Sequence, residues 1–144
     1  MQMTPLRGSD GSDAIHGPNG PLVLIVEDDP ETRQYLVDLL NRHGFRTDAA
    51  HNGLQALDKA LASPPDLVLS DIVVPGIDGI ELCRRLRADK RTRAVPLLAV
   101  TGYEDRHYRV RALDAGADRV LIKPFEPEVL VREVRELASQ RAGI

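Results

Sequence analysis

The fold is decided by residues 66–79, Asp66-Leu67-Val68-Leu69-Ser70-Asp71-Ile72-Val73-Val74-Pro75-Gly76-Ile77-Asp78-Gly79. The apolar run from Leu67 to Leu69 predicts a strand buried on both faces, and Asp71 stands at its end, where the chain must turn. Pro75-Gly76 supplies turn chemistry, and Asp78-Gly79 opens a helical pattern. Asp71 should therefore lie at the carboxyl end of a strand, beneath a short loop. Open parallel sheets build their sites at this end.

Outward from this unit, the chain repeats a strand followed by a helix five times, with short connections. Such alternation predicts an α/β fold: a doubly wound, five-stranded parallel sheet with helices on both faces and right-handed crossovers. Strands are expected at residues 22–26, 46–50, 67–69, 96–100 and 120–122. Helices are expected at residues 30–43, 53–62, 80–86, 104–115 and 128–138.

The spacing of apolar residues predicts which face of each helix is buried. In the helix capped by Asn52, Leu54, Leu57 and Leu61 are expected to face inward. Cys83 is expected to be a packed thiol rather than a reactive one. A basic cluster near the end of the third helix is expected to be a solvated face, with nucleic-acid contact as the alternative; it comprises Arg84, Arg85, Arg87, Lys90, Arg91 and Arg93.

Length and composition favour one folded domain. The chain has 144 residues, of which 42% are hydrophobic, and a net charge of -3 that argues against general binding of nucleic acid. Residues 1–20 are polar and glycine-rich, which predicts a flexible tail, with a docking arm as the alternative. The folded domain is expected at residues 21–141. No apolar run approaches the length of a membrane helix and no signal peptide is visible, so a cytoplasmic location without membrane contact is expected.

Five polar residues fall at the carboxyl ends of four predicted strands: Glu27, Asp28, Asp71, Thr101 and Lys123. These ends share one edge of a parallel sheet, so the side chains should meet. Carboxylates brought together repel one another unless a cation compensates their charge. An all-oxygen set favours a hard ion, and Mg²⁺ fits because it prefers a few carboxylates, a carbonyl and several waters.

The remaining groups of this set suit a phosphoryl group. Lys123 offers a mobile positive charge for a phosphate oxygen, and Thr101 offers a hydroxyl donor. Asp71 would be the nucleophile, because carboxylates form aspartyl phosphates when cations neutralise the incoming charge. Taken singly, each residue has a structural explanation: Asp28 or Asp29 as a helix N-cap, Thr101 as a strand end, Lys123 as a solvated charge.

Together these motifs resemble the receiver domain of two-component response regulators, across residues 21–141. The matching features are Glu27-Asp28 after an apolar strand, Asp71 followed by Pro75-Gly76 and Asp78-Gly79, Thr101-Gly102, and Lys123-Pro124-Phe125. The resemblance implies a flavodoxin-like sheet of strand order 2-1-3-4-5, for which the chemotaxis member of the family is a standard example.

The resemblance also implies roles. Asp71 would accept phosphate from a histidine kinase or phosphotransfer protein, and Asp28, Asp71 and the Val73 carbonyl would bind Mg²⁺ directly. Glu27 would act on the ion through a water, whereas Asp29 would lie outside the metal shell. Thr101 and Lys123 would hold phosphate oxygens, and the Lys123-Pro124 peptide would be cis.

In one respect the sequence departs from the family pattern. Many receivers carry Tyr or Phe three positions before the lysine, as a ring that moves on activation, and here that position is Val120. Tyr103 or Tyr108 could take its place, or Tyr103 could be an ordinary rim residue.

The expected protein is a single-domain phosphoacceptor, not an enzyme, that changes its affinity for a downstream protein, with a phosphorylation-dependent dimer as one form of response. Its partner surface is expected on the helix from Glu104 to Ala115, the strand from Val120 and the last helix. A relay intermediate that passes phosphate to a histidine phosphotransfer protein is one alternative. An aspartate-nucleophile phosphohydrolase is another, disfavoured because its general acid would stand at Val73. A receiver-like module that ignores phosphate is a third, disfavoured because all the chemical positions are filled.

Overall fold

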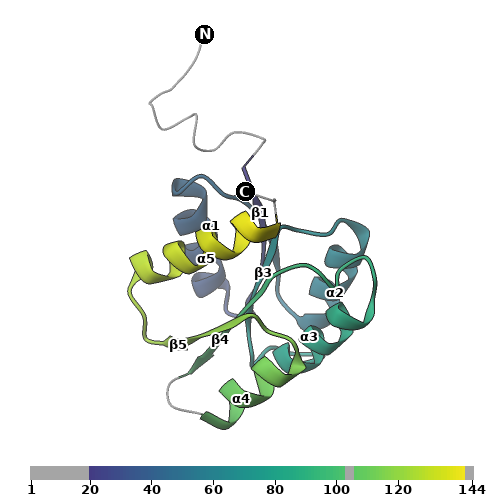
Figure 1. Ribbon diagram of the computed structural model, residues 1–144. Helices are drawn as coiled ribbons and strands as arrows, with labels where there is room; N and C mark the ends of the chain where they lie inside the picture. Colours follow the sequence, from purple (N-terminus) through teal and green to yellow (C-terminus); the bar gives the residue numbers. More distant parts are fainter. Residues whose placement is uncertain (1–19, 103–105, 142–144) are drawn as a thin grey trace.

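A computed structural model describes residues 20–102 and 106–141, and these residues alternate between strand and helix (Figure 1). The strands are β1 (Leu22–Val26), β2 (Arg46–Ala50), β3 (Leu67–Asp71), β4 (Leu97–Gly102) and β5 (Arg119–Lys123). The helices are α1 (Pro30–Arg42), α2 (Gly53–Ala62), α3 (Gly79–Ala88), α4 (Arg106–Ala115) and α5 (Pro127–Arg141).

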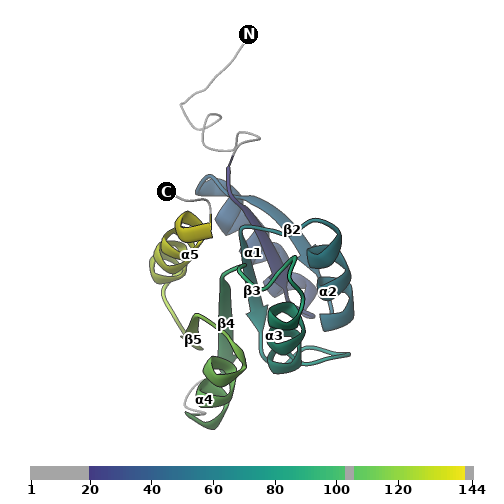
Figure 2. The ribbon, with the colours of Figure 1, turned by 45° about the vertical axis from the view of Figure 1, so that its right-hand side comes forward.

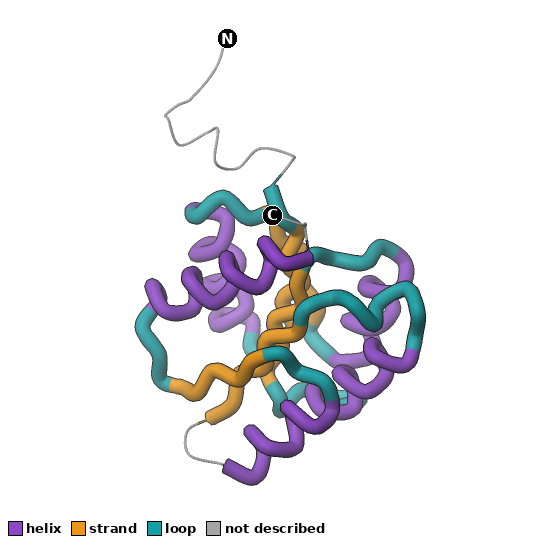
Figure 3. Tube along the Cα trace, in the orientation of Figure 1, coloured by secondary structure: helices purple, strands orange, loops and turns teal. Residues whose placement is uncertain are grey.

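The strands form one parallel sheet in the order β2-β1-β3-β4-β5, which confirms the expected doubly wound α/β fold. Figures 2 and 3 show the strands as a layer between two groups of helices. One hydrophobic cluster joins the sheet to α2, α3 and α4, and the other joins it to α1 and α5. The central strands of the sheet are therefore covered by helices on both faces, as the apolar run of β3 predicted.

The helix ends follow their sequence signals. Asp29, Asn52 and Asp78 cap α1, α2 and α3, and each side chain accepts a hydrogen bond from a backbone N–H in the first turn. Gly44 and Gly116 follow α1 and α4 with positive φ angles of 93° and 115°, a conformation that glycine adopts without steric cost.

The buried face of α2 differs from the prediction. Gly53, Ala56 and Ala60 are buried, whereas Leu54 is 49% exposed and Leu57 is only partly buried. The helix lies so close to the loop after β3 that a Cβ on Gly53 would collide with the carbonyl oxygen of Ile77. The small residues of α2 therefore face inward, and its leucine side chains lie at the edges of the buried face.

Several element boundaries also differ by one to three residues, among them those of β3, which ends at Asp71, and of α3, which spans Gly79–Ala88. β4 continues to Gly102 instead of ending at Val100, and β5 begins at Arg119 and includes Lys123. α5 extends to Arg141. The expected start of α4 at Glu104 falls outside the described residues. Among the helices that the structure describes, none has the length and apolar character needed to cross a membrane.

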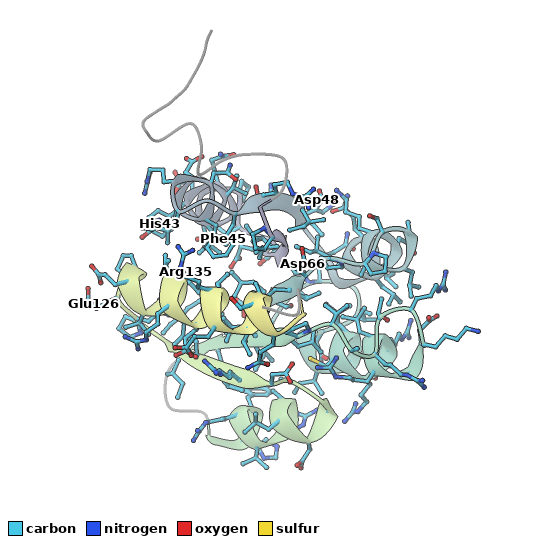
Figure 4. All side chains as sticks on the ribbon, turned by 45° about the horizontal axis from the view of Figure 1, so that its top comes forward. His43, Phe45, Asp48, Asp66, Glu126 and Arg135 are labelled. Atoms are coloured by element: carbon cyan, nitrogen blue, oxygen red, sulfur yellow. The ribbon has the colours of Figure 1, made fainter. Side chains whose placement is uncertain are left out.

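α5 is joined to the end of α1 by Arg135. Its guanidinium lies 5.0 Å from the centroid of the Phe45 ring and donates a hydrogen bond of 3.0 Å to the carbonyl oxygen of His43 (Figure 4). Phe45 is buried beneath it. The two helices on this side of the sheet are thereby linked at their solvent-facing edge.

Arg87 is not part of a solvated face, in contrast to the prediction for the basic cluster. Its guanidinium donates to the carbonyl oxygens of Gly116 at 2.7 and 2.9 Å, Arg93 at 2.8 Å and Val95 at 2.6 Å. It also pairs with Asp118 at 2.9 Å. The side chain thus ties α3 to the connection before β4 and to the turn between α4 and β5.

We expect Arg87→Met to lower the free energy of unfolding by about 2–3 kcal/mol, because several carbonyl oxygens and the Asp118 carboxylate lose their donor at once. Urea unfolding followed by circular dichroism measures the loss. Arg84→Met is the matched control, since Arg84 is 56% exposed and its one ion pair within the described residues is with Glu81, at 3.4 Å. A control that loses as much stability as Arg87→Met would contradict the assigned role.

Candidate functional site

The predicted site residues lie where neighbouring strands end, on what we call the carboxyl-end rim: Glu27, Asp28, Asp71, Thr101 and Lys123. The strand register explains their proximity, because Val26 pairs with Ser70 and Asp71 pairs with Val100. Gly102 then pairs with Lys123. Parallel strands in this register bring the residue after each strand to the same edge of the sheet.

Asp71 and Lys123 are in direct contact. The Lys123 Nζ lies 2.9 Å from Asp71 Oδ2, and the backbone N–H of Val73 donates to Asp71 Oδ1 at 3.0 Å. The Asp71 side chain is 14% exposed, so solvent can reach one edge of it. Both carboxylate oxygens are held, one by a flexible cation and the other by the backbone of the following loop.

The charge of Lys123 is stabilised by the acids of the rim. Burial by itself lowers the pKa of Lys123, but the hydrogen bond and charge of Asp71, together with Glu27 and Asp28, outweigh it and raise the pKa above its usual value. Lys123 is therefore a permanent cation at neutral pH. The peptide bond between Lys123 and Pro124 is cis, as the family resemblance implied.

Glu27 is the most enclosed acid of the rim, with 5% of its surface exposed. Its Oε2 accepts a hydrogen bond of 3.1 Å from the N–H of Asp29. Burial raises the pKa of Glu27, and the charge of Asp71 raises it further, whereas the Asp29 N–H and Lys123 act in the opposite direction. The net rise means that the protein alone does not fully compensate the negative charge of Glu27.

Asp28 and Asp29 have different surroundings although they are adjacent. Asp29 accepts hydrogen bonds from the N–H and hydroxyl of Thr32 at 2.9 and 2.6 Å, which lower its pKa and make it the N-cap of α1. Asp28 is exposed, and its nearness contributes to the raised pKa of Glu27. Asp29 is therefore engaged in capping α1, whereas the Asp28 side chain is accessible to solvent.

Thr101 is brought to the rim at the end of β4 and is buried. Within the described residues, its hydroxyl donates one long hydrogen bond of 3.4 Å, to the carbonyl oxygen of Gly102. A Cβ on Gly102 would meet no described atom within 4 Å. Tyr103, the candidate rim ring, lies outside the described residues. Val120 and Tyr108 pack against the cluster formed with α2, α3 and α4.

A divalent cation fits the donor set of the rim. Within the described ranges, no three His, Cys, Asp or Glu side chains converge as a ready metal cluster. Mg²⁺ does not need such a cluster, since it takes one or two carboxylates and keeps several waters. The uncompensated charge of Glu27 and the exposed Asp28 are the features that favour a hard cation here.

A recess of about 340 Å³ opens beside Asp71, between α1 and the start of α5. Its walls are mostly apolar and include Tyr35, Leu36, Phe125 and Leu130. Sequence reasoning missed this recess, because its walls come from segments far apart in the chain.

Arg33 is the residue of the site that sequence reasoning did not identify. It belongs to the first turn of α1, and its guanidinium donates to the carbonyl oxygens of Glu27 and Asp28. A signal was present, because a cation in the first turn opposes the helix dipole and calls for an explanation.

Comparison with known proteins identifies the family. The family model of the response regulator receiver domain matches residues 23–135, so the chain belongs to that family, which confirms the resemblance found in the sequence. Among curated relatives, the DNA-binding response regulator MtrA of Mycolicibacterium smegmatis is 42% identical over 78% of this chain and 48% of its own length. The chain spans about half the length of the first curated relatives that it matches.

Solved structures agree with this assignment. A putative response regulator from Chloroflexus aurantiacus superposes with a TM-score of 0.81 at 34% identity, over 84% of this chain and 99% of the other. The receiver domain of the sensor histidine kinase PA1611 from Pseudomonas aeruginosa has a TM-score of 0.78 at 31% identity, over 83% and 98% of the two chains. That structure has a magnesium ion coordinated in its active site cleft.

We expect Glu27→Gln to raise the midpoint of thermal unfolding at pH 7 without Mg²⁺, because the folded protein then no longer holds an ionised carboxylate with a raised pKa. An acid whose pKa is raised by folding favours the folded state most below its usual pKa, which is 4.5, and loses that contribution as the pH rises through the folded value. The advantage of the variant should therefore disappear below pH 4.5.

Glu31→Gln is the control for this measurement, since Glu31 is exposed in the first turn of α1. It should give no gain at pH 7. A Glu27→Gln protein that is less stable than its parent at pH 7 would show that the carboxylate charge is compensated in the folded state.

Proposed function

We propose that the chain is a Mg²⁺-dependent phosphoacceptor in which Asp71 receives a phosphoryl group from the phosphohistidine of a histidine kinase or phosphotransfer protein. The observation that carries the proposal is the contact of 2.9 Å between Lys123 and Asp71 beside the enclosed Glu27. A carboxylate oxygen of Asp71 would form the new P–O bond while the P–N bond of phosphohistidine breaks and the imidazole leaves.

The chain's own groups have distinct roles in this transfer. Lys123 is a flexible side chain, so it can move from Asp71 Oδ2 to an oxygen of the incoming phosphoryl group. The N–H of Val73 keeps Asp71 Oδ1 in place during that movement. Thr101 supplies a hydroxyl donor from the end of β4.

For the metal, we propose Asp28, Asp71 and the backbone carbonyl of Val73 as direct ligands, with Glu27 acting through a water. When bound, Mg²⁺ would neutralise negative charge on the phosphoryl oxygens. The donor set supports this choice, as does the magnesium ion coordinated in the active site cleft of the related PA1611 receiver.

The domain boundaries, the cellular location and the partners of the chain remain predictions. We propose residues 21–141 as the receiver unit, acting in the cytoplasm through protein partners and not as an enzyme. The tail expected at residues 1–20 lies, apart from Gly20, outside the described residues. The expected lack of nucleic-acid contact concerns this chain alone, since the longer relative MtrA is a DNA-binding response regulator. A phosphohydrolase is not supported, because Val73, two residues after Asp71, has no group for acid catalysis.

We expect Asp71 to be labelled by a small phosphodonor only when Mg²⁺ is present, because the incoming charge needs both the metal and Lys123. Asp71→Asn should abolish labelling, and Asp58→Asn, a change to an exposed acid of α2, should leave it intact. The readout is intact-protein mass spectrometry. Acid-stable label of undiminished yield on Asp71→Asn would refute the assignment.

The proposed partner surface spans α4, β5 and α5. Val110 and Leu113 of α4 and Ile122 of β5 are 56%, 41% and 39% exposed, which leaves apolar area on neighbouring elements. An open groove beside Leu113 is lined by Arg109, Asp118, Arg119, Val120, Leu121 and Glu133. A response of this surface to phosphorylation would change the affinity for a downstream protein or for a second copy.

We expect a phosphate mimic with Mg²⁺ to change amide hydrogen exchange in residues 106–123, because Thr101 and Lys123 adjoin the segments that build this surface. Mass spectrometry of peptides with and without the mimic measures the change, and Asp71→Asn with the mimic is the control. Changes confined to residues 30–60 would place the responding surface elsewhere.

A further inference from the structure

Arg33 contacts the backbone of the two acids that follow β1. Its Nη1 donates to the carbonyl oxygen of Glu27 at 3.0 Å and to that of Asp28 at 3.3 Å. The side chain is half-buried, and it is placed in the first turn of α1, where the helix dipole disfavours a cation. The two hydrogen bonds that its guanidinium donates to these carbonyl oxygens account for an arginine at this position.

We propose that Arg33 is a positioning residue for the metal site, an inference that rests on the proposed function. By holding two successive carbonyl oxygens on one side of the loop, the guanidinium fixes the backbone from which the Glu27 and Asp28 side chains project. Both hydrogen bonds come from Nη1, whose two N–H groups have fixed directions in the guanidinium plane, whereas the N–H groups of a lysine ammonium rotate freely.

The other hydrogen bonds of the loop, residues 27–29, fix its two ends but not its middle residue. The N–H of Glu27 donates to the carbonyl oxygen of Ala50 at 3.0 Å, and Asp29 is fixed as the N-cap of α1. Both ends of the three-residue loop are therefore anchored. Asp28, the exposed middle residue and a proposed direct ligand, is held through its carbonyl oxygen by Arg33.

Positioning and charge have opposite consequences for metal binding, which makes the proposal testable. A guanidinium near a divalent cation repels it, so loss of the charge alone would strengthen Mg²⁺ binding. Loss of the two hydrogen bonds lets the loop move. Binding of Mg²⁺ must then order the loop, and the entropy cost of ordering weakens the binding. The direction of the change therefore shows which effect dominates.

The experiment measures the dissociation constant of Mg²⁺ alone by isothermal titration calorimetry, with no phosphodonor. We expect Arg33→Met to bind Mg²⁺ about fivefold more weakly than the parent, the effect of losing a hydrogen bond or two of ordinary strength. Arg33→Lys should fall between the two. Arg42→Met is the matched control, because it removes an exposed arginine from the last turn of the same helix and should leave the constant unchanged.

Amide hydrogen exchange without metal supplies a second readout. Arg33→Met should increase exchange at residues 27–29 and leave the residues of β3 unchanged. Mg²⁺ binding by Arg33→Met that is equal to or tighter than binding by the parent would overturn the proposal. A parent protein that binds no Mg²⁺ would instead overturn the proposed metal site itself.

Discussion

The ion pair between Lys123 and Asp71 crosses β4, because β3 and β5 are not neighbours in the sheet. Such a contact requires the carboxyl ends of three strands to lie level with one another. The register and the short connections of the doubly wound sheet provide that alignment. The pair also places a cation among the acids of the rim, which offsets part of the negative charge gathered in this small region.

The sequence was sufficient to predict the sheet, its order and the rim residues. Apolar runs that end in a polar residue are strong signals, and the family resemblance added the strand order. Glu27, Asp71 and Lys123 meet as expected because their positions follow from topology alone. Thr101 reaches the rim for the same reason, but topology does not specify the direction of its hydroxyl.

Close packing could not be predicted in the same way. The hydrophobic pattern of α2 favours its leucines, yet the nearness of Ile77 to Gly53 selects the alanine face, and this distance is a property of two segments together. Arg87 and Arg33 were hidden for a related reason. Their partners are backbone carbonyl oxygens, which every residue possesses and which leave no mark in a sequence.

The contacts of Arg87 have a mechanical consequence for α4. They anchor the turn that follows this helix, whereas the exposed Val110 and Leu113 lie along its outer side. A helix that is held at its C-terminal end can rotate about that end. A small displacement near Thr101 would then swing the start of α4 through a wider arc than its end. The side chains of Val110 and Leu113 would then move by unequal distances. A partner in contact with both would meet a surface whose angle has changed.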